Sequence, residues 1–474
     1  MTFSKGKLMS DIFTSTVAAL STARGKAGIA VIRVTGAECF DIVSKVFVPK
    51  SGKALKDYVS HTAVFGDMLY EGDVVDSGLC TVFFAPNSYT GEDTAEISCH
   101  GNDLCVSLIL SSLYAAGAVP AGPGEFTRRA FSNGKLTLSQ AEAVAELIDA
   151  QSTAALRLSS AKVSGKLSRE ISDISNSLTN ILASVYAFID YPDEDLTDMS
   201  KDEMREALSK AKERLHKLCK SYNSGRAVSC GINTAIVGLP NSGKSSLLNM
   251  LTDSDRAIVT DIAGTTRDII TEKVTLGNIT LKLSDTAGIR QTDDAVEKIG
   301  VERAYDALRE AELVLAVIDG AAPLCDGEKE IIQKLSEETE KNVILVINKN
   351  DISEMPPEKA EYVKSFENNF CASVSASAKN GSGKDALSET INKLYPSGDE
   401  IISTGLVITG ARIYAAVNGA YNAVCDGLVT LENYTQDLAG TDIERAIACL
   451  SEADGRTVTQ EIVDNIFSRF CVGK

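Results

Sequence analysis

Histidine is scarce in this chain of 474 residues, and its cysteines follow no metal-binding or disulfide pattern. The three histidines, His61, His100 and His216, are too few for a histidine-rich metal site. The eleven cysteines are odd in number and include no C-x-x-C pair, which argues against a disulfide framework or a zinc ribbon. We therefore expect reduced thiols and a cytoplasmic location.

Basic residues are in the minority. Lysine and arginine total 47 against 65 aspartates and glutamates, so the formal net charge is −18. Because a broad nucleic-acid-binding surface needs clustered positive charge, such a surface is excluded for the chain as a whole. Any contact with RNA has to be local or shared with a basic partner.

Long apolar runs are also missing. Residues 1–10 carry two lysines and no sustained apolar stretch follows them, so the sequence shows no secretory signal. The longest uncharged run, Leu104 to Ala121, contains three serines, Gly117 and Pro120. We interpret this run as a buried helix that ends at Gly117, and not as a membrane span.

The chain does have enough hydrophobic sequence, 44%, for about three domains with real cores. Residues 1–131 have the pattern of an α/β domain, with strands expected at 29–34, 81–84 and 95–98. Residues 132–228 and 397–474 have helical patterns, and residues 229–396 lie between them as a second α/β domain. Because each helical flank is small, we predict one helical bundle domain into which residues 229–396 are inserted.

The helical flanks are predicted from their apolar spacing. Apolar residues recur every three or four positions from Leu167 to Phe188, which indicates a long helix used as a bundle core or, as the less common alternative, as a dimer seam. A second amphipathic helix is expected from Met204 to Cys219, and a linker at 223–225. Near the end of the chain, helices are expected along Ile443, Ala446, Ile447 and Leu450, and then along Ile462, Ile466 and Phe470.

The most informative motif is Gly238-Leu239-Pro240-Asn241-Ser242-Gly243-Lys244-Ser245, which fits G-x-x-x-x-G-K-[ST] between a β-branched segment and a helical one. In this motif the backbone N–H groups of a glycine-rich turn surround phosphate oxygens. Lys244 would neutralise the β- and γ-phosphates, and the Ser245 hydroxyl would bind Mg²⁺. The motif predicts a nucleoside triphosphate site.

Further segments follow in the order that a guanine-nucleotide domain requires. Asp285-Thr286-Ala287-Gly288 would hold the Mg²⁺ shell and face the γ-phosphate, and Thr266 in Gly264–Asp268 would also bind Mg²⁺. Asp351, in Asn348-Lys349-Asn350-Asp351, can accept two hydrogens from guanine, a pair that adenine does not offer. Ser377-Ala378-Lys379 would close the base pocket. The segments together predict a Ras-like, mostly parallel P-loop domain that selects GTP and Mg²⁺.

One position departs from Ras-like GTPases. Ile289 follows Gly288 where those enzymes carry the glutamine that orients the attacking water. Glu297, a few residues downstream, is our candidate for that role, although composition alone would make it an ordinary exposed acid.

Taken over its length, the sequence resembles the tRNA-modification GTPase family MnmE, also called TrmE. The matching segments are 29–36, 86–93, 123–131, 190–194, the GTPase motifs and the terminal Phe470-Cys471-Val472-Gly473-Lys474. The resemblance implies an N-terminal α/β domain that binds a 5-formyl-tetrahydrofolate-type folate and dimerises, a helical domain and an inserted GTPase domain. It also implies an FAD-dependent partner, MnmG (GidA), and a carboxymethylaminomethyl-type group added at C5 of the tRNA wobble uridine, U34.

The resemblance also implies site residues. Folate contacts fall on Arg33, Glu96, Lys135 and Lys474, groups whose charges suit a pterin edge and a glutamate tail. Glu297 matches the water-orienting glutamate, and K⁺ takes the place of an arginine finger when GTPase domains pair. The implied K⁺ ligands are Asn241, Thr260, Ile262 and Thr265.

The full set of expected nucleotide contacts and catalytic groups follows from the motifs and the resemblance together. Nucleotide contacts are expected at Asn241, Ser242, Gly243, Lys244, Ser245, Ser246, Thr260, Thr265, Thr266, Asp285, Gly288, Asn348, Lys349, Asp351, Ser377, Ala378 and Lys379. Catalytic roles are expected for Glu297, Lys244 and Cys471. Cys471 is open to roles as nucleophile, folate-site wall or packing residue, and a prenylation box is rejected because no polybasic run adjoins it.

Two alternative functions share parts of this pattern. A GTPase switch in ribosome assembly would carry the same motifs, but it would need a basic RNA-binding module and would not end in Cys-Val-Gly-Lys. A folate-dependent enzyme regulated by GTP is the other alternative.

Overall fold

The computed structural model describes residues 15–190, 199–252, 271–284, 308–338, 341–395, 404–434 and 436–474. The chain forms two compact units, one of Met1–Ala145 with Ile447–Lys474 and one of Glu146–Ala446. The expected combination of an N-terminal α/β domain, a helical domain and an inserted, mostly parallel α/β domain is confirmed.

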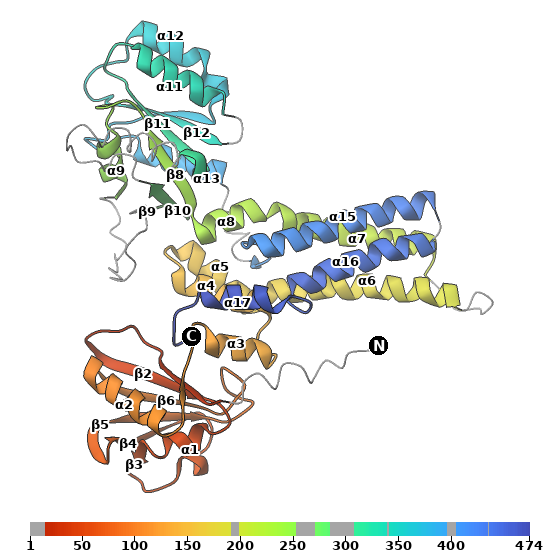
Figure 1. Ribbon diagram of the computed structural model, residues 1–474. Helices are drawn as coiled ribbons and strands as arrows, with labels where there is room; N and C mark the ends of the chain where they lie inside the picture. Colours follow the sequence, from red (N-terminus) through yellow and green to blue (C-terminus); the bar gives the residue numbers. More distant parts are fainter. Residues whose placement is uncertain are drawn as a thin grey trace. The chain divides into compact units, whose positions relative to one another are not determined.

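The first unit is built on a seven-stranded sheet in the order β3-β4-β5-β6-β2-β1-β7 (Figure 1). Neighbouring strands are antiparallel except β1 and β7. The strands are β1 (Val17–Leu20), β2 (Ala27–Thr35), β3 (Phe47–Pro49), β4 (Thr62–Tyr70), β5 (Asp73–Phe83), β6 (Thr94–Gly101) and β7 (Val119–Pro120). The helices before the second unit are α1 (Cys39–Val43), η1 (Leu55–Asp57), α2 (Asp103–Ala115), α3 (Glu125–Ser132) and α4 (Leu138–Asp149).

Side-chain alternation places one face of this sheet on the core. Ala30, Ile32 and Val34 of β2 are buried, and Arg33 between them is only half-buried. Successive side chains of a strand point to opposite faces, so Arg33 belongs to the face away from that core. This face carries the expected folate residues of β2 and β6.

The uncharged run after β6 is a helix, as predicted. α2 begins after Asn102, whose side chain accepts the N–H groups of Leu104 and Cys105, and it buries an apolar face of Val106, Ile109 and Leu113. Gly117, at φ +121°, follows its end, where a glycine adopts a conformation that side chains disfavour. None of the helices in the described ranges is both long and apolar enough to cross a lipid bilayer.

The second unit contains a six-stranded sheet in the order β13-β12-β11-β8-β10-β9. All neighbours are parallel except the edge pair β10 and β9. The strands are β8 (Ile232–Val237), β9 (Thr271–Leu276), β10 (Ile279–Ser284), β11 (Leu313–Asp319), β12 (Asn342–Asn348) and β13 (Ala372–Ser375). The accompanying helices are α9 (Lys244–Thr252), α11 (Asp326–Ser336), α12 (Pro357–Ser365), η2 (Glu367–Asn369) and α13 (Lys384–Leu394).

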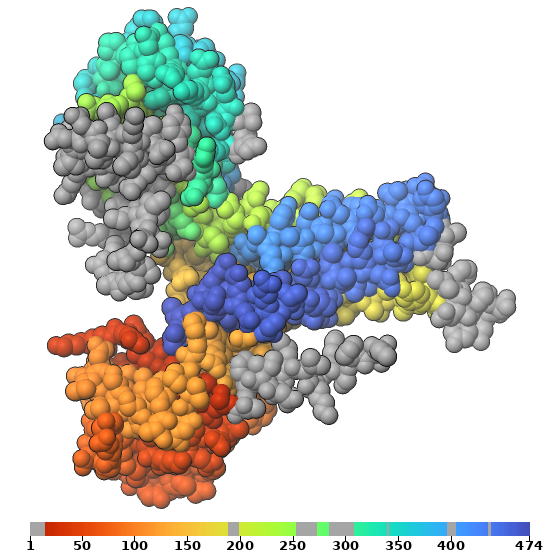
Figure 2. Space-filling model, in the orientation of Figure 1, coloured from red at the N-terminus to blue at the C-terminus, as the bar shows by residue number. Residues whose placement is uncertain are grey.

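The remaining helices come from both sides of this inserted domain in the sequence. They are α5 (Thr153–Val163), α6 (Lys166–Asp190), α7 (Lys201–Lys220), α8 (Tyr222–Cys230), α15 (Ala411–Asn433), α16 (Gln436–Ala453) and α17 (Gln460–Ser468). α15 packs along α7. In Figure 2, α15 belongs to the blue region and α7 to the yellow-green region next to it. The predicted stripe of α6 is buried in a bundle core at Leu167, Ile171, Ile174, Leu178, Ile181 and Val185.

Two details of the helical prediction are wrong. Residues 223–225, expected as a linker, lie inside α8. Gly225 there serves packing, because a Cβ would lie 2.3 Å from Val407 and 2.4 Å from Ile408. In α17 the buried face runs through Val463 and Phe467 to the expected Phe470, whereas the expected Ile462 and Ile466 are only half-buried. Which apolar side chains of a helix are buried depends on the elements that pack against it, and not on their spacing alone.

Candidate functional site

The predicted phosphate loop lies between β8 and α9, at the carboxyl end of a central parallel strand. Close backbone contacts explain its glycines: a Cβ on Gly238 would lie 2.2 Å from the Val317 carbonyl oxygen, and one on Gly243 would lie 2.0 Å from Asn348 Nδ2. Asn241 and Gly243 have φ values of +64° and +97°. The loop therefore has the glycine-dependent turn conformation expected of a sequence whose backbone N–H groups bind phosphate.

Lys244 begins α9 beside this loop. Its Nζ donates hydrogen bonds to the carbonyl oxygens of Gly238 and Leu239, at 3.0 and 2.8 Å. Desolvation lowers the pKa of Lys244 from its ordinary value. The ammonium group thus lies over the loop that would hold the phosphates.

Asn348, at the end of β12, joins the phosphate loop to the predicted base pocket. Its Nδ2 donates to the Ser242 carbonyl oxygen at 3.0 Å, and its Oδ1 accepts from the Ala378 N–H at 2.9 Å. The side chain is only 1% exposed, so both bonds are shielded from water. Three sequence motifs that are more than 25 residues apart are thereby connected through one amide.

Asp351 and Ser377 form the other side of the pocket. The Ser377 hydroxyl donates to Asp351 Oδ1 at 2.6 Å, which fixes the orientation of the carboxylate. A cavity of about 400 Å³ lies among the motifs. Its lining residues are Gly243, Ser246, Asn249, Asn348, Lys349, Asp351, Ile352, Ala378 and Lys379.

Asp319 is a member of this site that the sequence analysis missed. It lies at the end of β11, and its Oδ2 accepts a hydrogen bond from Lys349 Nζ at 2.6 Å. Burial by itself would raise the pKa of Asp319, but the Lys349 and Ala321 hydrogen bonds hold it below its ordinary value. The position of Asp319 at a parallel strand end, level with Asn348, was the signal that could have found it.

A buried lysine holds the loop that follows Asp319. Lys359 of α12 is fully buried, and its Nζ donates to the Asp319 carbonyl oxygen and to Glu328 Oε2, both at 2.6 Å. Glu328 Oε1 in turn accepts the Asp319 N–H at 3.3 Å. These bonds fix the backbone at Asp319 and so the carboxylate that meets Lys349.

The structure brings together the described part of the predicted nucleotide set. Asn241, Ser245 and Ser246 lie in the phosphate loop and the start of α9, and Lys379 lines the cavity. The other predicted residues lie outside the described ranges, namely Thr260, Ile262, Thr265, Thr266, Asp285, Gly288 and Glu297.

The predicted folate residues lie in the first unit. Arg33 on β2 faces Glu96 on β6, and the two are joined by hydrogen bonds from Arg33 Nε and Nη2 to Glu96 Oε1 at 2.9 and 2.8 Å. The Arg33 guanidinium lies 5.2 Å from the Tyr89 ring centre and 5.4 Å from the Phe126 ring centre. A ligand that contacts either charged group therefore approaches both, together with two aromatic faces.

The chain end lies against this region. The Lys474 carbonyl oxygen accepts the Phe126 N–H at 3.1 Å, and the Cys471 carbonyl oxygen accepts the Gly124 N–H at 3.3 Å. The Ser21 hydroxyl donates to the Gly473 carbonyl oxygen at 2.9 Å. The tail is thus tied to the loop before α3, with the Cys471 side chain exposed.

Lys135 lies close to the loop 86–93 that carries Tyr89. Its Nζ donates to the Pro86 carbonyl oxygen at 3.0 Å, and its side chain passes Gly91. Arg33, Lys135 and Lys474 therefore adjoin α3 or this loop, and Glu96 is paired with Arg33. No bond connects Lys135 to Arg33 directly within the described residues.

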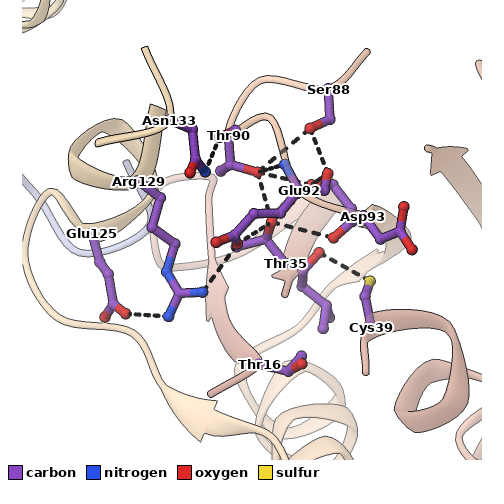
Figure 3. A network of polar contacts seen from close by, with 12 residues as sticks. Thr16, Thr35, Cys39, Ser88, Thr90, Glu92, Asp93, Glu125, Arg129 and Asn133 are labelled. Atoms are coloured by element: carbon purple, nitrogen blue, oxygen red, sulfur yellow. Dashed lines mark hydrogen bonds and ion pairs between the residues drawn. The ribbon is translucent and has the colours of Figure 1, made fainter. Parts of the chain in front are cut away.

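A buried arginine, Arg129, holds α3 against that loop (Figure 3). It is fully buried, donating from Nη1 to Glu92 Oε2 at 3.0 Å and from Nη2 to Glu125 Oε1 at 2.8 Å. Thr35 continues the network, through hydroxyl contacts to Glu92 Oε2 and Thr90 Oγ1 at 3.2 and 2.7 Å. The network was missed because each member reads as an ordinary surface residue in the sequence.

We expect Arg129→Met to lower the free energy of unfolding of the first unit by about 3 kcal/mol, because it leaves two carboxylates without their buried partner. For a unit of this size, that corresponds to a Tm lower by roughly 6–12 °C in scanning calorimetry of the full chain. Arg128→Met is the matched control, since Arg128 is a more exposed neighbour paired with Asp464 and should change stability by less than about 1 kcal/mol. Equal effects of the two variants would contradict the assigned role of Arg129.

Comparison with known proteins covers nearly the whole chain. Residues 16–135 match the family model described as GTP-binding protein TrmE N-terminus, and residues 138–471 match the model described as MnmE helical domain. A protein of Clostridioides difficile (strain 630) named tRNA modification GTPase MnmE is 38% identical over 97% of this chain and 99% of its own length.

Two further relatives carry the same name. The one from Thermoanaerobacter sp. (strain X514) is 39% identical and the one from Bacteroides thetaiotaomicron is 38% identical, each over 97% of this chain and 99% of the relative. The aligned region, 97% of this chain in each case, includes both units described above. The chain therefore belongs to the tRNA modification GTPase MnmE (TrmE) family.

Proposed function

We propose that this chain hydrolyses GTP to GDP and phosphate in the cytoplasm, as one subunit of a complex that modifies C5 of U34 in tRNA. The observation that carries the proposal is the Asn348 amide, which joins a phosphate loop to a pocket containing an oriented aspartate. A carboxylate at Asp351 selects guanine, and full-length similarity to proteins named tRNA modification GTPase supports the tRNA role.

The proposed hydrolysis uses Lys244 and Mg²⁺ to offset phosphate charge. The described residues fit this chemistry, because Ser245 offers a hydroxyl at the start of α9 and Lys244 offers an ammonium group over the loop. Thr266, Asp285 and Gly288 complete the Mg²⁺ and γ-phosphate contacts in the proposal. Glu297 orients the attacking water in the proposal. Asn241, Thr260, Ile262 and Thr265 would hold a K⁺ ion, which would supply positive charge near the phosphates.

The proposed modification chemistry adds a carboxymethylaminomethyl-type group. The flavoprotein MnmG is the proposed partner, and the group's carbon comes from a folate bound by Arg33, Glu96, Lys135 and Lys474, where Cys471 also lies. A homodimer through the first unit is part of the same proposal. The partner also supplies the basic RNA surface that this acidic chain, with a net charge of −18, does not provide as a whole.

The decisive experiment measures wobble nucleosides by mass spectrometry in a strain lacking this chain. We expect the C5-modified uridine to disappear, to return with the wild-type gene, and to remain absent with Lys244→Ala. Copurification of a flavoprotein with the wild-type chain would support the partner assignment. Unchanged nucleosides with accumulating ribosome precursors would instead support the ribosome-assembly alternative.

The folate assignment makes a separate prediction. Arg33→Ala is expected to weaken binding of 5-formyl-tetrahydrofolate by roughly 10- to 100-fold, since charge-assisted hydrogen bonds contribute about 1.5–3 kcal/mol. Calorimetric titration of the full chain measures this, and its affinity for GTP should stay unchanged. Lys56→Ala serves as the control, because Lys56 is an exposed cation paired with Asp41 in the same unit. Unaltered folate affinity would remove Arg33 from the site.

A further inference from the structure

Two cysteines and an aspartate meet in the first unit, away from the predicted folate residues. Asp76 lies on β5, Cys99 on β6, and Cys105 in the first turn of α2. One donor atom from each, a carboxylate oxygen and two Sγ atoms, lie within 4.8 Å of one another. The sequence spacing of the cysteines gave no sign of this grouping, because a strand end and a helix start bring them together.

The carboxylate of Asp76 is fixed by the backbone. Its Oδ2 accepts the His100 N–H at 2.8 Å and the Cys105 S–H at 3.4 Å. Its Oδ1 accepts the Ser77 N–H at 2.8 Å and lies 2.8 Å from His100 Nδ1. Asp76 therefore presents an oriented oxygen to the thiols, with an imidazole beside it.

Burial and the neighbouring Asp76 carboxylate disfavour the thiolate forms of Cys99 and Cys105. Burial, and after it the neighbouring Asp76 and Cys99, together raise the pKa of the Cys105 thiol to about 12. Burial and then Asp76 also raise the pKa of Cys99. Hydrogen bonds from His100 lower the pKa of Asp76 in spite of its burial, so the carboxylate is ionised at neutral pH. A divalent cation bound among the three donors would attract both thiolates and the carboxylate, and so would stabilise all three as anions.

The donor set distinguishes between metals. Thiolates are soft ligands that favour Zn²⁺ over Mg²⁺ or Ca²⁺, and one carboxylate or imidazole commonly completes such a site. With Zn–S bonds of about 2.3 Å in tetrahedral geometry, the two sulfurs would lie about 3.8 Å apart. The donors, already within 4.8 Å, need to move by about 1 Å or less.

We propose that Asp76, Cys99 and Cys105 bind one Zn²⁺ ion. The ion connects the neighbouring strands β5 and β6 to the N-terminal turn of α2 and so adds to the hydrogen bonds that Asp76 makes with His100 and Cys105. Its role is structural, since it would fasten the start of α2 to the end of the sheet.

The test uses the full-length chain without an affinity tag, purified under anaerobic reducing conditions and stripped of metal by a chelator. Zn²⁺ is titrated against a colorimetric competitor, and Co²⁺ serves as the spectroscopic probe. We expect one Zn²⁺ per chain, a thiolate-to-cobalt charge-transfer band, and a higher Tm of the first unit with Zn²⁺. Cys105→Ser should weaken Zn²⁺ binding by at least about 100-fold and abolish the band.

The matched control is Cys371→Ser, because Cys371 is an exposed cysteine of the other unit and should leave binding unchanged. Cys99→Ser is the second ligand variant, since a serine hydroxyl can keep the contact that Cys99 Sγ makes with the Ala30 carbonyl oxygen at 3.7 Å. Calorimetry verifies that each variant is folded. Zn²⁺ uptake by Cys105→Ser equal to that of the wild type, no stoichiometric uptake by the wild type, or a Cys99–Cys105 disulfide in the anaerobically purified chain would overturn the proposal.

Discussion

Asp351→Asn is expected to weaken GTP binding by about 1,000-fold or more and to change the preferred nucleotide to xanthosine triphosphate. The carboxylate can accept both the N1–H and the exocyclic amine of guanine, whereas an amide offers one acceptor and one N–H₂ donor. Xanthine matches the amide because it carries a carbonyl where guanine has the amine. Fluorescence competition with GTP and xanthosine triphosphate measures the two affinities.

The hydrogen bond that orients Asp351 can be kept in Asp351→Asn. The Ser377 hydroxyl that donates to Asp351 Oδ1 can donate equally to an asparagine oxygen, so the side chain should keep its orientation. Asp326→Asn is the matched control, because the Asp326 side chain is fully exposed on α11 and should leave nucleotide preference unaltered. Retained preference for GTP in Asp351→Asn would reject the base-pocket assignment.

Exchange of K⁺ for Na⁺ is expected to slow GTP turnover by about 100-fold, the effect of losing one preorganised electrostatic contact to the transition state. Asn241 carries this prediction within the described residues, because it lies in the phosphate loop with φ +64°. Asn241→Gly removes the side-chain oxygen while glycine tolerates the same backbone conformation. We expect that variant to hydrolyse GTP slowly and equally in both salts, as measured by phosphate release.

Asn241→Asp supplies the control, because aspartate keeps a side-chain oxygen and also tolerates positive φ. It should retain stimulation by K⁺. Nucleotide affinity measured in parallel separates a loss of hydrolysis from a loss of binding. Equal wild-type rates in K⁺ and Na⁺ would remove the cation from the mechanism.

The nucleotide motifs were readable from the sequence because each one couples a strand end to a short, chemically constrained loop. Gly243 is restricted by its positive φ and Asp351 by direct ligand chemistry, so their types and spacing carry the information, whereas the contact that requires Gly238 comes from the distant Val317. Helical periodicity predicted α6 correctly, because the apolar residues along one side of this helix are buried in the bundle core. It was less accurate for α17, where Val463 and Phe467 are covered and Ile462 is only half-buried.

The tertiary structure decided which residues support those motifs. Asp319 meets Lys349 only because β11 and β12 are parallel neighbours, and Lys359 reaches Asp319 from a helix 40 residues later in the chain. Arg129 is paired with Glu92 and Glu125, and the sequence gave no sign that these residues of two separate segments meet.

By itself, the sequence determined the nucleotide class, the order of domains and the family resemblance, because these depend on local motifs and periodicity. Only the tertiary structure brought Asp76, Cys99 and Cys105 to one point and placed the terminal Lys474 beside Phe126. Contacts of this kind depend on strand pairing and helix packing between distant segments. Many apolar contacts in the core together determine how these segments pack, so no short sequence motif predicts which distant residues meet.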